Sequence, residues 1–327
     1  MRLALARFVC CAALGIFATG LVSAADDLAN IEQQFAAGDY GDAVNTLRAI
    51  VSQNPNDAPA HYWLGRCYYE ERDYNNAVAQ LEKATALDAK SSAYHQWLGR
   101  AYGEKADLEH SFLLARQVKK EFEAAVQADP SNIQARRDLE DYLLEAPWIV
   151  GGSKDDALAQ VNEIAKLDPI QGHLARADYD AHLGKDADAA AEYNSALEMK
   201  PQTADPYFEV ADYYAKLRNV GALQQVVSEA ASADPKDPRL TFYHGESGVV
   251  SGTDLTLAEQ ELKSYIAGSP QRSDWPSHST ARFWLGTLYE KQGNKMAASE
   301  QYRAALQLDS GNKAARQALD NLEKSIR

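Results

Sequence analysis

The chain has 327 residues, and its 33 lysines and arginines stand against 47 aspartates and glutamates, which gives a formal net charge of −14 at pH 7. A surface this acidic repels nucleic acid and anionic lipid at long range, so we expect neither as a partner.

The first 24 residues have the three parts of a secretory signal peptide. Arg2 and Arg7 precede an apolar run, Phe8–Val22, and the small residues Ser23 and Ala24 follow it. The run is short for a membrane span, so we expect cleavage after Ala24 and a periplasmic location in place of an N-terminal anchor. Nothing later in the sequence is apolar for long enough to span a membrane.

Cleavage at that point would leave Cys67 as the one cysteine of the mature chain. No internal disulfide could then form. Because Cys67 lies among small packing residues, we expect a buried, inert thiol and not a reactive one.

Residues 58–91 carry the pattern of two short helices joined by a turn. Apolar residues three and four apart give each helix an apolar stripe, and the two stripes can pack together. Gly65 and Ala77 are small where the helices would cross, which lets the backbones approach to roughly 8–10 Å. The segment resembles the tetratricopeptide repeat in the order and spacing of Leu64, Gly65, Tyr68, Tyr74, Ala77, Leu81 and Ala84.

The pattern recurs with a period of about 34 residues, as it must if each hairpin is to bury its apolar face against a neighbour. The resemblance implies an all-α, right-handed superhelical solenoid of about eight hairpins over residues 25–312, in one elongated domain. A polar-backed helix at residues 313–327 would cap its last apolar face. The expected units are 24–57, 58–91, 92–132, 133–169, 170–203, 204–237, 238–278 and 279–312.

Three of these units are longer than the period. The third gains residues around 103–111 that are good helix formers, so we expect a lengthened helix or a short extra turn. The fourth has an insertion, Ala146–Lys154, in which Ser153 is expected to cap the next helix. The apolar tip Trp148–Val150 either tucks against the neighbouring hairpin, which we favour, or is exposed for a partner. The seventh ends in a polar linker, residues 269–277.

No catalytic motif is present, so we expect neither an enzyme nor a cofactor. The Gly-Gly-Ser-Lys sequence at residues 151–154 lacks the rest of a phosphate-binding loop. His61, His95 and His173 share one repeat position, which points to structural roles.

The resemblance implies that the first helix of each unit lines a concave, ligand-binding groove. Arg66 and Arg100 occupy equivalent places on adjacent units, and Tyr62 and Tyr69 flank Arg66. Further along, Asp178, Asp212 and Glu246 occupy the same place as the two arginines, while Phe208, Phe242 and Phe283 form a row one helical turn earlier. The groove is thus expected to be basic and tyrosine-lined at its N-terminal end, and acidic and phenylalanine-lined at its C-terminal end.

We therefore predict a protein–protein interaction module, an adaptor or assembly scaffold, that holds a peptide or protein of the cell envelope in this groove. Charge reversal of Arg66 and Arg100 together should then abolish capture of the partner. Two alternatives stay open. The charges can be a plain solvated face with Arg66–Glu70 and Arg100–Glu104 pairs, or Asp178, His182, Asp212 and Glu246 can bind a metal or small molecule.

Overall fold

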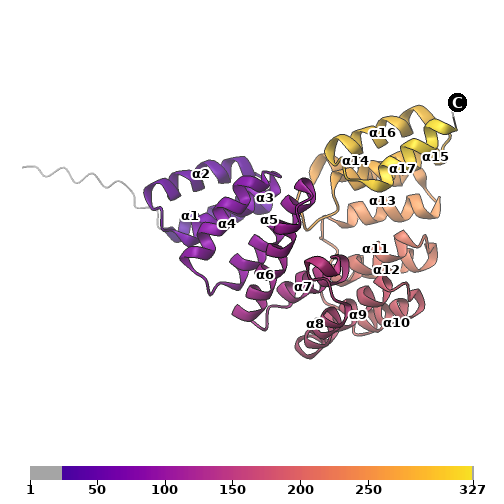
Figure 1. Cartoon of the computed structure of the whole chain (residues 1–327). Coiled ribbons are helices and arrows are strands. Elements are labelled where there is room, and N and C mark those ends of the chain that lie inside the picture. Colours follow the sequence, from indigo (N-terminus) through magenta and orange to yellow (C-terminus); the bar gives the residue numbers. More distant parts are fainter. Residues whose placement is uncertain (1–23, 326–327) are drawn as a thin grey trace, which may run out of the picture.

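The computed structural model describes residues 24–325, so the expected signal peptide lies outside the described residues except for Ala24. The regular secondary structure of that part of the chain is all helical, without a strand (Figure 1). None of its helices is long and apolar enough to cross a bilayer. The elements are α1 (Ala24–Ala37), α2 (Tyr40–Gln53), α3 (Ala58–Glu70), α4 (Tyr74–Leu87), α5 (Ser92–Glu109), α6 (Phe112–Ala128), α7 (Ile133–Glu145), the 3-10 helix η1 (Trp148–Val150), α8 (Lys154–Leu167), α9 (Pro169–His182), α10 (Asp186–Glu198), α11 (Asp205–Lys216), α12 (Val220–Ala233), α13 (Leu240–Ser251), α14 (Leu255–Gly268), α15 (His278–Lys291), α16 (Lys295–Leu308) and α17 (Lys313–Lys324).

The helices form an all-α superhelical repeat. Each odd-numbered helix from α1 to α15 packs against the even-numbered helix that follows it, and each also contacts the next odd-numbered helix. Even-numbered helices make no such contacts with one another. The odd-numbered helices therefore lie on the inner, concave side of the curve that Figure 1 shows. α17 packs on α15 and α16 and buries Ala315 and Leu322 there.

Close approach of paired helices explains the glycine in the first helix of several units. A Cβ atom on Gly65 would lie 2.6 Å from Leu81 Cγ on the partner helix, and Ala77 beside it is fully buried. The crossing of α3 and α4 at these two small residues confirms the expectation from the sequence.

The third and fourth units differ in how they accommodate their extra residues. α5 and α6 have 18 and 17 residues, so the insertion in the third unit lengthens both helices. In the fourth unit, Ser153 accepts a hydrogen bond from the Asp156 N–H and caps α8, as expected. Val150 is buried, but Trp148 and Ile149 are exposed, so the prediction that the whole tip tucks in is wrong. A 3-10 helix has three residues per turn, so only one of three successive side chains can face the protein.

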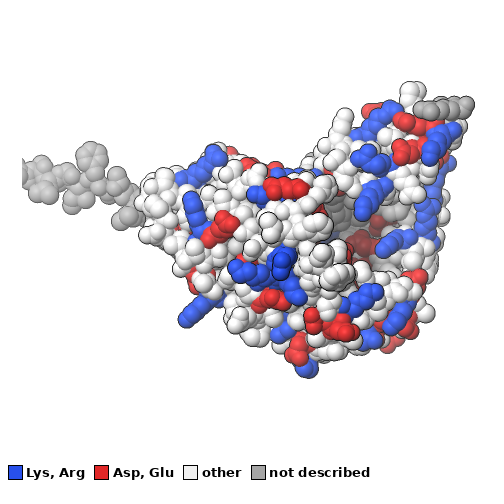
Figure 2. All heavy atoms as spheres, viewed as in Figure 1, with Lys and Arg blue, Asp and Glu red and all other residues white. Residues whose placement is uncertain are grey.

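The polar linker 269–277 closes the superhelix on itself. Ser273 donates to the two Glu70 carboxylate oxygens from its backbone N–H at 2.8 Å and from its hydroxyl at 2.7 Å. The Tyr40 hydroxyl donates to the Gln271 carbonyl oxygen at 2.9 Å, and Arg72 donates to the Leu308 carbonyl oxygen at 3.1 Å. The first two hairpins thus touch the last two, and Figure 2 shows the hollow between these arms.

Candidate functional site

The concave face carries a row of charged residues, one from each odd-numbered helix between α3 and α13. Each is the ninth residue of its expected unit: Arg66, Arg100, Asp141, Asp178, Asp212 and Glu246. Asp141 was missed because the two insertions displace it from the regular spacing. Counting from the start of its own unit would have found it.

Arg66 is held inside an aromatic box and is not a free groove cation. Its guanidinium carbon lies 4.3 Å from the ring centres of Phe35 and Trp97 and 4.4 Å from that of Trp63. The Tyr62 hydroxyl accepts a hydrogen bond from Arg66 at 3.4 Å. The expected Arg66–Glu70 pair is absent from the described contacts, because the rings surround the guanidinium and Glu70 is engaged by the linker.

Arg100 is also neutralised inside the protein. Its Nε and Nη2 atoms lie 2.7 and 2.9 Å from the two carboxylate oxygens of Asp138 on α7, a bidentate pair. The expected Arg100–Glu104 pair is therefore wrong. Glu104 instead accepts a hydrogen bond from the Tyr69 hydroxyl at 3.4 Å, and the Tyr69 ring packs edge-on against Trp97.

The middle of the face holds an ion-pair network that the sequence did not suggest. Arg137 of α7 donates to Asp178 at 2.5 Å and to Glu209 at 2.8 Å, so it joins three successive odd-numbered helices. Asp178 also accepts from the Tyr193 hydroxyl. Arg137 stands where other units have the aromatic row, so the change of residue type at that repeat position was the available signal.

Glu140 lies one turn from Arg137 and is fully buried. Neither of its carboxylate oxygens has a hydrogen-bond partner among the described residues. Burial outweighs the nearby Arg137 charge and raises the pKa of Glu140 well above its usual range. Its Oε2 atom lies 4.0 Å from Arg137 Nε.

The C-terminal part of the face presents acids without basic partners. Asp212 is exposed to the groove and accepts a hydrogen bond from the Tyr243 hydroxyl at 3.3 Å. The surrounding protein limits its hydration and raises its pKa to about 7. Glu246 is 3% exposed, and its Oε2 atom has no hydrogen-bond partner among the described residues. Burial, and next the Asp212 charge, raise the pKa of Glu246 well above its usual range.

The phenylalanine row is not an open contact surface. Phe208 and Phe242 are buried, because this repeat position points toward the neighbouring hairpins. Phe208 stacks on Tyr243 with ring centres 4.2 Å apart. Phe283 is half-buried beside Trp284. The expectation that all three phenylalanines offer area to a ligand is therefore wrong for the first two.

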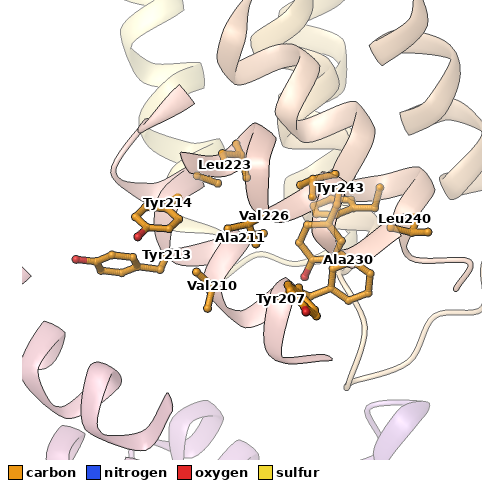
Figure 3. Close-up of a cluster of buried hydrophobic side chains, with 14 of the residues drawn as sticks. Tyr207, Val210, Ala211, Tyr213, Tyr214, Leu223, Val226, Ala230, Leu240 and Tyr243 are labelled. Atoms are coloured by element: carbon orange, nitrogen blue, oxygen red, sulfur yellow. The ribbon is translucent and has the colours of Figure 1, made fainter. Parts of the chain in front are cut away.

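Packing around α11 explains why Asp212 faces the groove. Figure 3 shows Tyr207, Val210, Ala211 and other apolar side chains of α11 packed together with residues of α12 and α13. Between Pro206 and Ala215, the residues of α11 that are not buried are Glu209 and Asp212. Because they are three apart, both lie on one face of the helix.

The described residues contain no group of three His, Cys, Asp or Glu side chains that could hold a metal ion. Asp178 is taken up by Arg137 and Tyr193, and His182 is exposed at the end of α9. The metal-binding alternative therefore gains no support.

Cys67 and the repeated histidines have structural surroundings, as expected. Cys67 is fully buried, and burial raises the pKa of its thiol to about 12. His61 lies 2.7 Å from Gln80 and 3.0 Å from the Pro55 carbonyl oxygen, His95 lies 2.7 Å from Glu121, and His173 lies 2.7 Å from Glu192. The contacts with Gln80, Glu121 and Glu192 each join the two helices of a unit.

Two family models described as tetratricopeptide repeats match the sequence, at residues 34–101 and 254–313. No curated protein matches it. Among solved structures, the Cut9–Hcn1 hetero-tetramer is 12% identical and covers 92% of this chain with a TM-score of 0.50, although the match spans just 56% of that chain. This likeness supports the fold alone.

Two bacterial proteins have lower TM-scores. A thermophilic TPR protein from Thermus thermophilus is 21% identical, with 61% of this chain and 98% of that chain covered and a TM-score of 0.47. A tetratricopeptide repeat protein from Parabacteroides merdae is 12% identical, with 91% of this chain and 98% of that chain covered and a TM-score of 0.47.

Proposed function

We propose that the concave face of this chain binds a protein or peptide partner, as a protein–protein interaction module, with support from the two tetratricopeptide-repeat models that match residues 34–101 and 254–313. In this role it is an adaptor or assembly scaffold without catalysis of its own. The observation that carries the proposal is the set of carboxyl groups on the concave face, Asp141, Asp212 and Glu246, that form no ion pair within the described residues.

The charge of the face defines the chemistry of the partner. Arg66, Arg100 and Arg137 already contact aromatic rings or carboxylates of the chain itself, and the nitrogens of Arg66 and Arg137 that have no hydrogen-bond partner, Nε and Nη1, are buried away from a ligand. The carboxyl groups of Asp141, Asp212 and Glu246 lack such a counter-charge among the described residues. A partner that brings lysine or arginine to Asp212 would supply the missing counter-charge and would arrive by electrostatic attraction. We therefore propose that the partner segment is basic, and not a segment that binds both a basic and an acidic end of the groove.

We also propose that the chain is exported and meets its partner in the cell envelope. The support is the basic, apolar and small-residue sequence of residues 1–24. A reporter that is active only outside the cytoplasm, fused after Ala24, should be active, and the mature protein should begin at Ala25 by mass spectrometry. An inactive reporter and an intact N-terminus would contradict export while leaving groove binding intact.

The groove is tested by affinity capture from an envelope extract. The baits are the wild type, the double variant Asp212→Asn/Glu246→Gln, and the control Asp188→Asn, which removes an exposed carboxylate from the even-numbered helix α10. We expect one or more proteins that the wild type and the control retain and the double variant loses, with retention falling at higher salt. An identical set of captured proteins on all three baits would refute binding at this face.

A further inference from the structure

The two insertions that interrupt the repeat pattern meet at one place in the fold. The first lengthens α5 and α6, and the second forms η1 between α7 and α8. η1 contacts α6. The Tyr142 hydroxyl lies 2.7 Å from the Ala115 carbonyl oxygen on α6 and 2.8 Å from the Val150 carbonyl oxygen on η1, and Lys119 of α6 donates to the Gly151 carbonyl oxygen at 3.1 Å. The η1 loop is therefore fixed against the long hairpin.

These two turns carry most of the strongly exposed apolar side chains of the protein. Trp148 is 84% exposed, Leu113 77%, Leu108 69%, Phe112 68% and Ile149 62%. Within residues 24–325, Met296 at 83% is the one other large apolar side chain exposed to this degree. Single exposed apolar residues are common, but five at the α5–α6 turn and on η1, which contacts α6, are the sign of an interaction surface. We call these five residues the apolar lip.

A cleft of about 380 Å³ lies beside the lip, between α5, α6, α7 and the start of η1. Its lining includes the apolar residues Ala106, Val118 and Val150. The volume is within the range of pockets that accept a ligand group. The cleft exists because α5 and α6 extend past the usual hairpin length, so their ends stand beside the η1 loop.

Four carboxylates line this cleft: Asp138 is paired with Arg100, which also lines it, and the other three are Asp107, Asp141 and Glu145. All three are exposed, and none forms an ion pair or a side-chain hydrogen bond among the described residues. The basic Lys119 beside them is already engaged by the Gly151 carbonyl oxygen and lies 3.7 Å from Glu123. Beside the Arg100–Asp138 pair, the cleft thus combines apolar lining residues with a rim of three carboxylates that form no ion pair among the described residues.

We propose that the cleft and the apolar lip form a second interaction surface, which takes a basic amphipathic segment of a protein partner. Apolar side chains of that segment pack on the lip and enter the cleft, and its lysine or arginine side chains pair with Asp107, Asp141 and Glu145. The proposal goes beyond groove binding, because the lip lies on the hairpin turns and does not need a ligand at Asp212.

Charge complementarity separates this partner from two other occupants of an apolar surface. A second copy of the chain would bring the same three carboxylates against themselves, in a protein that already carries a net charge of −14. An anionic lipid surface would be repelled by the same rim. A basic amphipathic segment is attracted by the rim and buries the lip.

The test uses a labelled 18-residue synthetic peptide with leucine on one helical face and lysine on the other, and a matched peptide with glutamate in place of lysine. Fluorescence anisotropy measures binding to the full chain. We expect the lysine peptide to bind, the glutamate peptide not to bind, and Trp148→Ser/Ile149→Ser to weaken binding at least about tenfold, as expected for loss of a central anchor. Met296→Ser, an equally exposed apolar residue on α16, should leave the affinity unchanged.

Further variants and assays identify which surface binds the peptide and what kind of partner occupies it. Asp188→Asn on α10 should leave affinity for the lysine peptide unchanged, whereas Asp107→Asn/Glu145→Gln should lower it. Loss with Asp212→Asn and none with the lip variants would place the peptide in the groove and overturn the proposal. Sedimentation of a wild-type dimer that Trp148→Ser/Ile149→Ser turns into a monomer would overturn it in favour of self-association. Lip-dependent flotation with phosphatidylglycerol vesicles would overturn it in favour of a membrane.

Discussion

Replacement of Arg66 by alanine is expected to destabilise the N-terminal hairpins by roughly 2–4 kcal/mol. Three aromatic rings lie 4.3–4.4 Å from its guanidinium carbon. Each such contact contributes roughly 0.5–2 kcal/mol, depending on how far the cation is desolvated, and the sum is less than additive because the rings share one cation. Phe35 comes from α1, and Trp97 from α5, so the loss loosens three units at once.

Urea denaturation, followed by far-UV circular dichroism and by tryptophan fluorescence, measures this effect. With a slope of about 2 kcal/mol per M urea, a loss of about 3 kcal/mol lowers the midpoint of the N-terminal transition by about 1.5 M. Arg66→Lys should lie between wild type and Arg66→Ala, because an ammonium keeps the charge but cannot stack its plane on the rings. The control is Arg116→Ala, which removes an exposed arginine of α6 that has no ion pair in the described part of the chain.

An unfolding free energy for Arg66→Ala that stays within about 0.5 kcal/mol of the values for both wild type and Arg116→Ala would refute the aromatic box. Arg66 would then be available to a ligand, as the sequence alone suggested. The same reasoning changes how binding should be tested. Charge reversal of Arg66 and Arg100 would place a carboxylate in the box and another beside Asp138, so lost capture could simply report lost folding.

Three further predictions follow from local contacts. Gly65→Ala should lower the free energy of unfolding in urea by roughly 1–3 kcal/mol, because the new Cβ would lie 2.6 Å from a Leu81 side-chain atom. The control Gly221→Ala should be neutral or stabilising, because a Cβ there would have no atom within 4 Å. Equal effects of the two substitutions would contradict the helix contact at Gly65. Glu246 takes up a proton on folding because its pKa is raised, so its contribution to stability falls as pH rises from its ordinary pKa of about 4.3 through the raised value. The melting temperature of Glu246→Gln should therefore change less between pH 5 and 8 than that of wild type. Parallel curves of melting temperature against pH would argue against a buried titrating carboxyl. Glu70→Ala removes both acceptors for the linker at residues 269–277, so hydrogen exchange of that linker should accelerate and the radius of gyration in X-ray scattering should increase, while unchanged values would show that the two arms stay together without these bonds.

Local sequence patterns were sufficient to predict the repeat architecture. The spacing of Leu64, Gly65 and Ala77 encodes a helix pair because it depends only on the 3.6-residue period and on contact between neighbouring helices. The composition of the insertion at residues 103–111 predicted longer helices for the same reason, since propensity acts within a few residues. Ser153 was identifiable as a cap because capping involves only the next three residues.

The state of each charged residue on the concave face was decided by tertiary structure. The repeat position gives the helix face but not what the side chain meets, and side chains as long as arginine reach residues of two neighbouring units. Arg100 thus met Asp138 in place of Glu104, and Arg137 met Asp178 and Glu209. Phe208 and Phe242 were buried because neighbouring hairpins close over their repeat position.

The closure of the superhelix is the feature that the sequence could predict least. Glu70 and Ser273 are separated by 203 residues, and their contact depends on the accumulated curvature of all the hairpins between them. The meeting of η1 with the long hairpin α5–α6 likewise depends on how the third and fourth units stack. Sequence periodicity determines each hairpin, because a hairpin is held by contacts between residues close in the chain. The small rotations between hairpins come from packing in three dimensions, and they decide which distant residues meet.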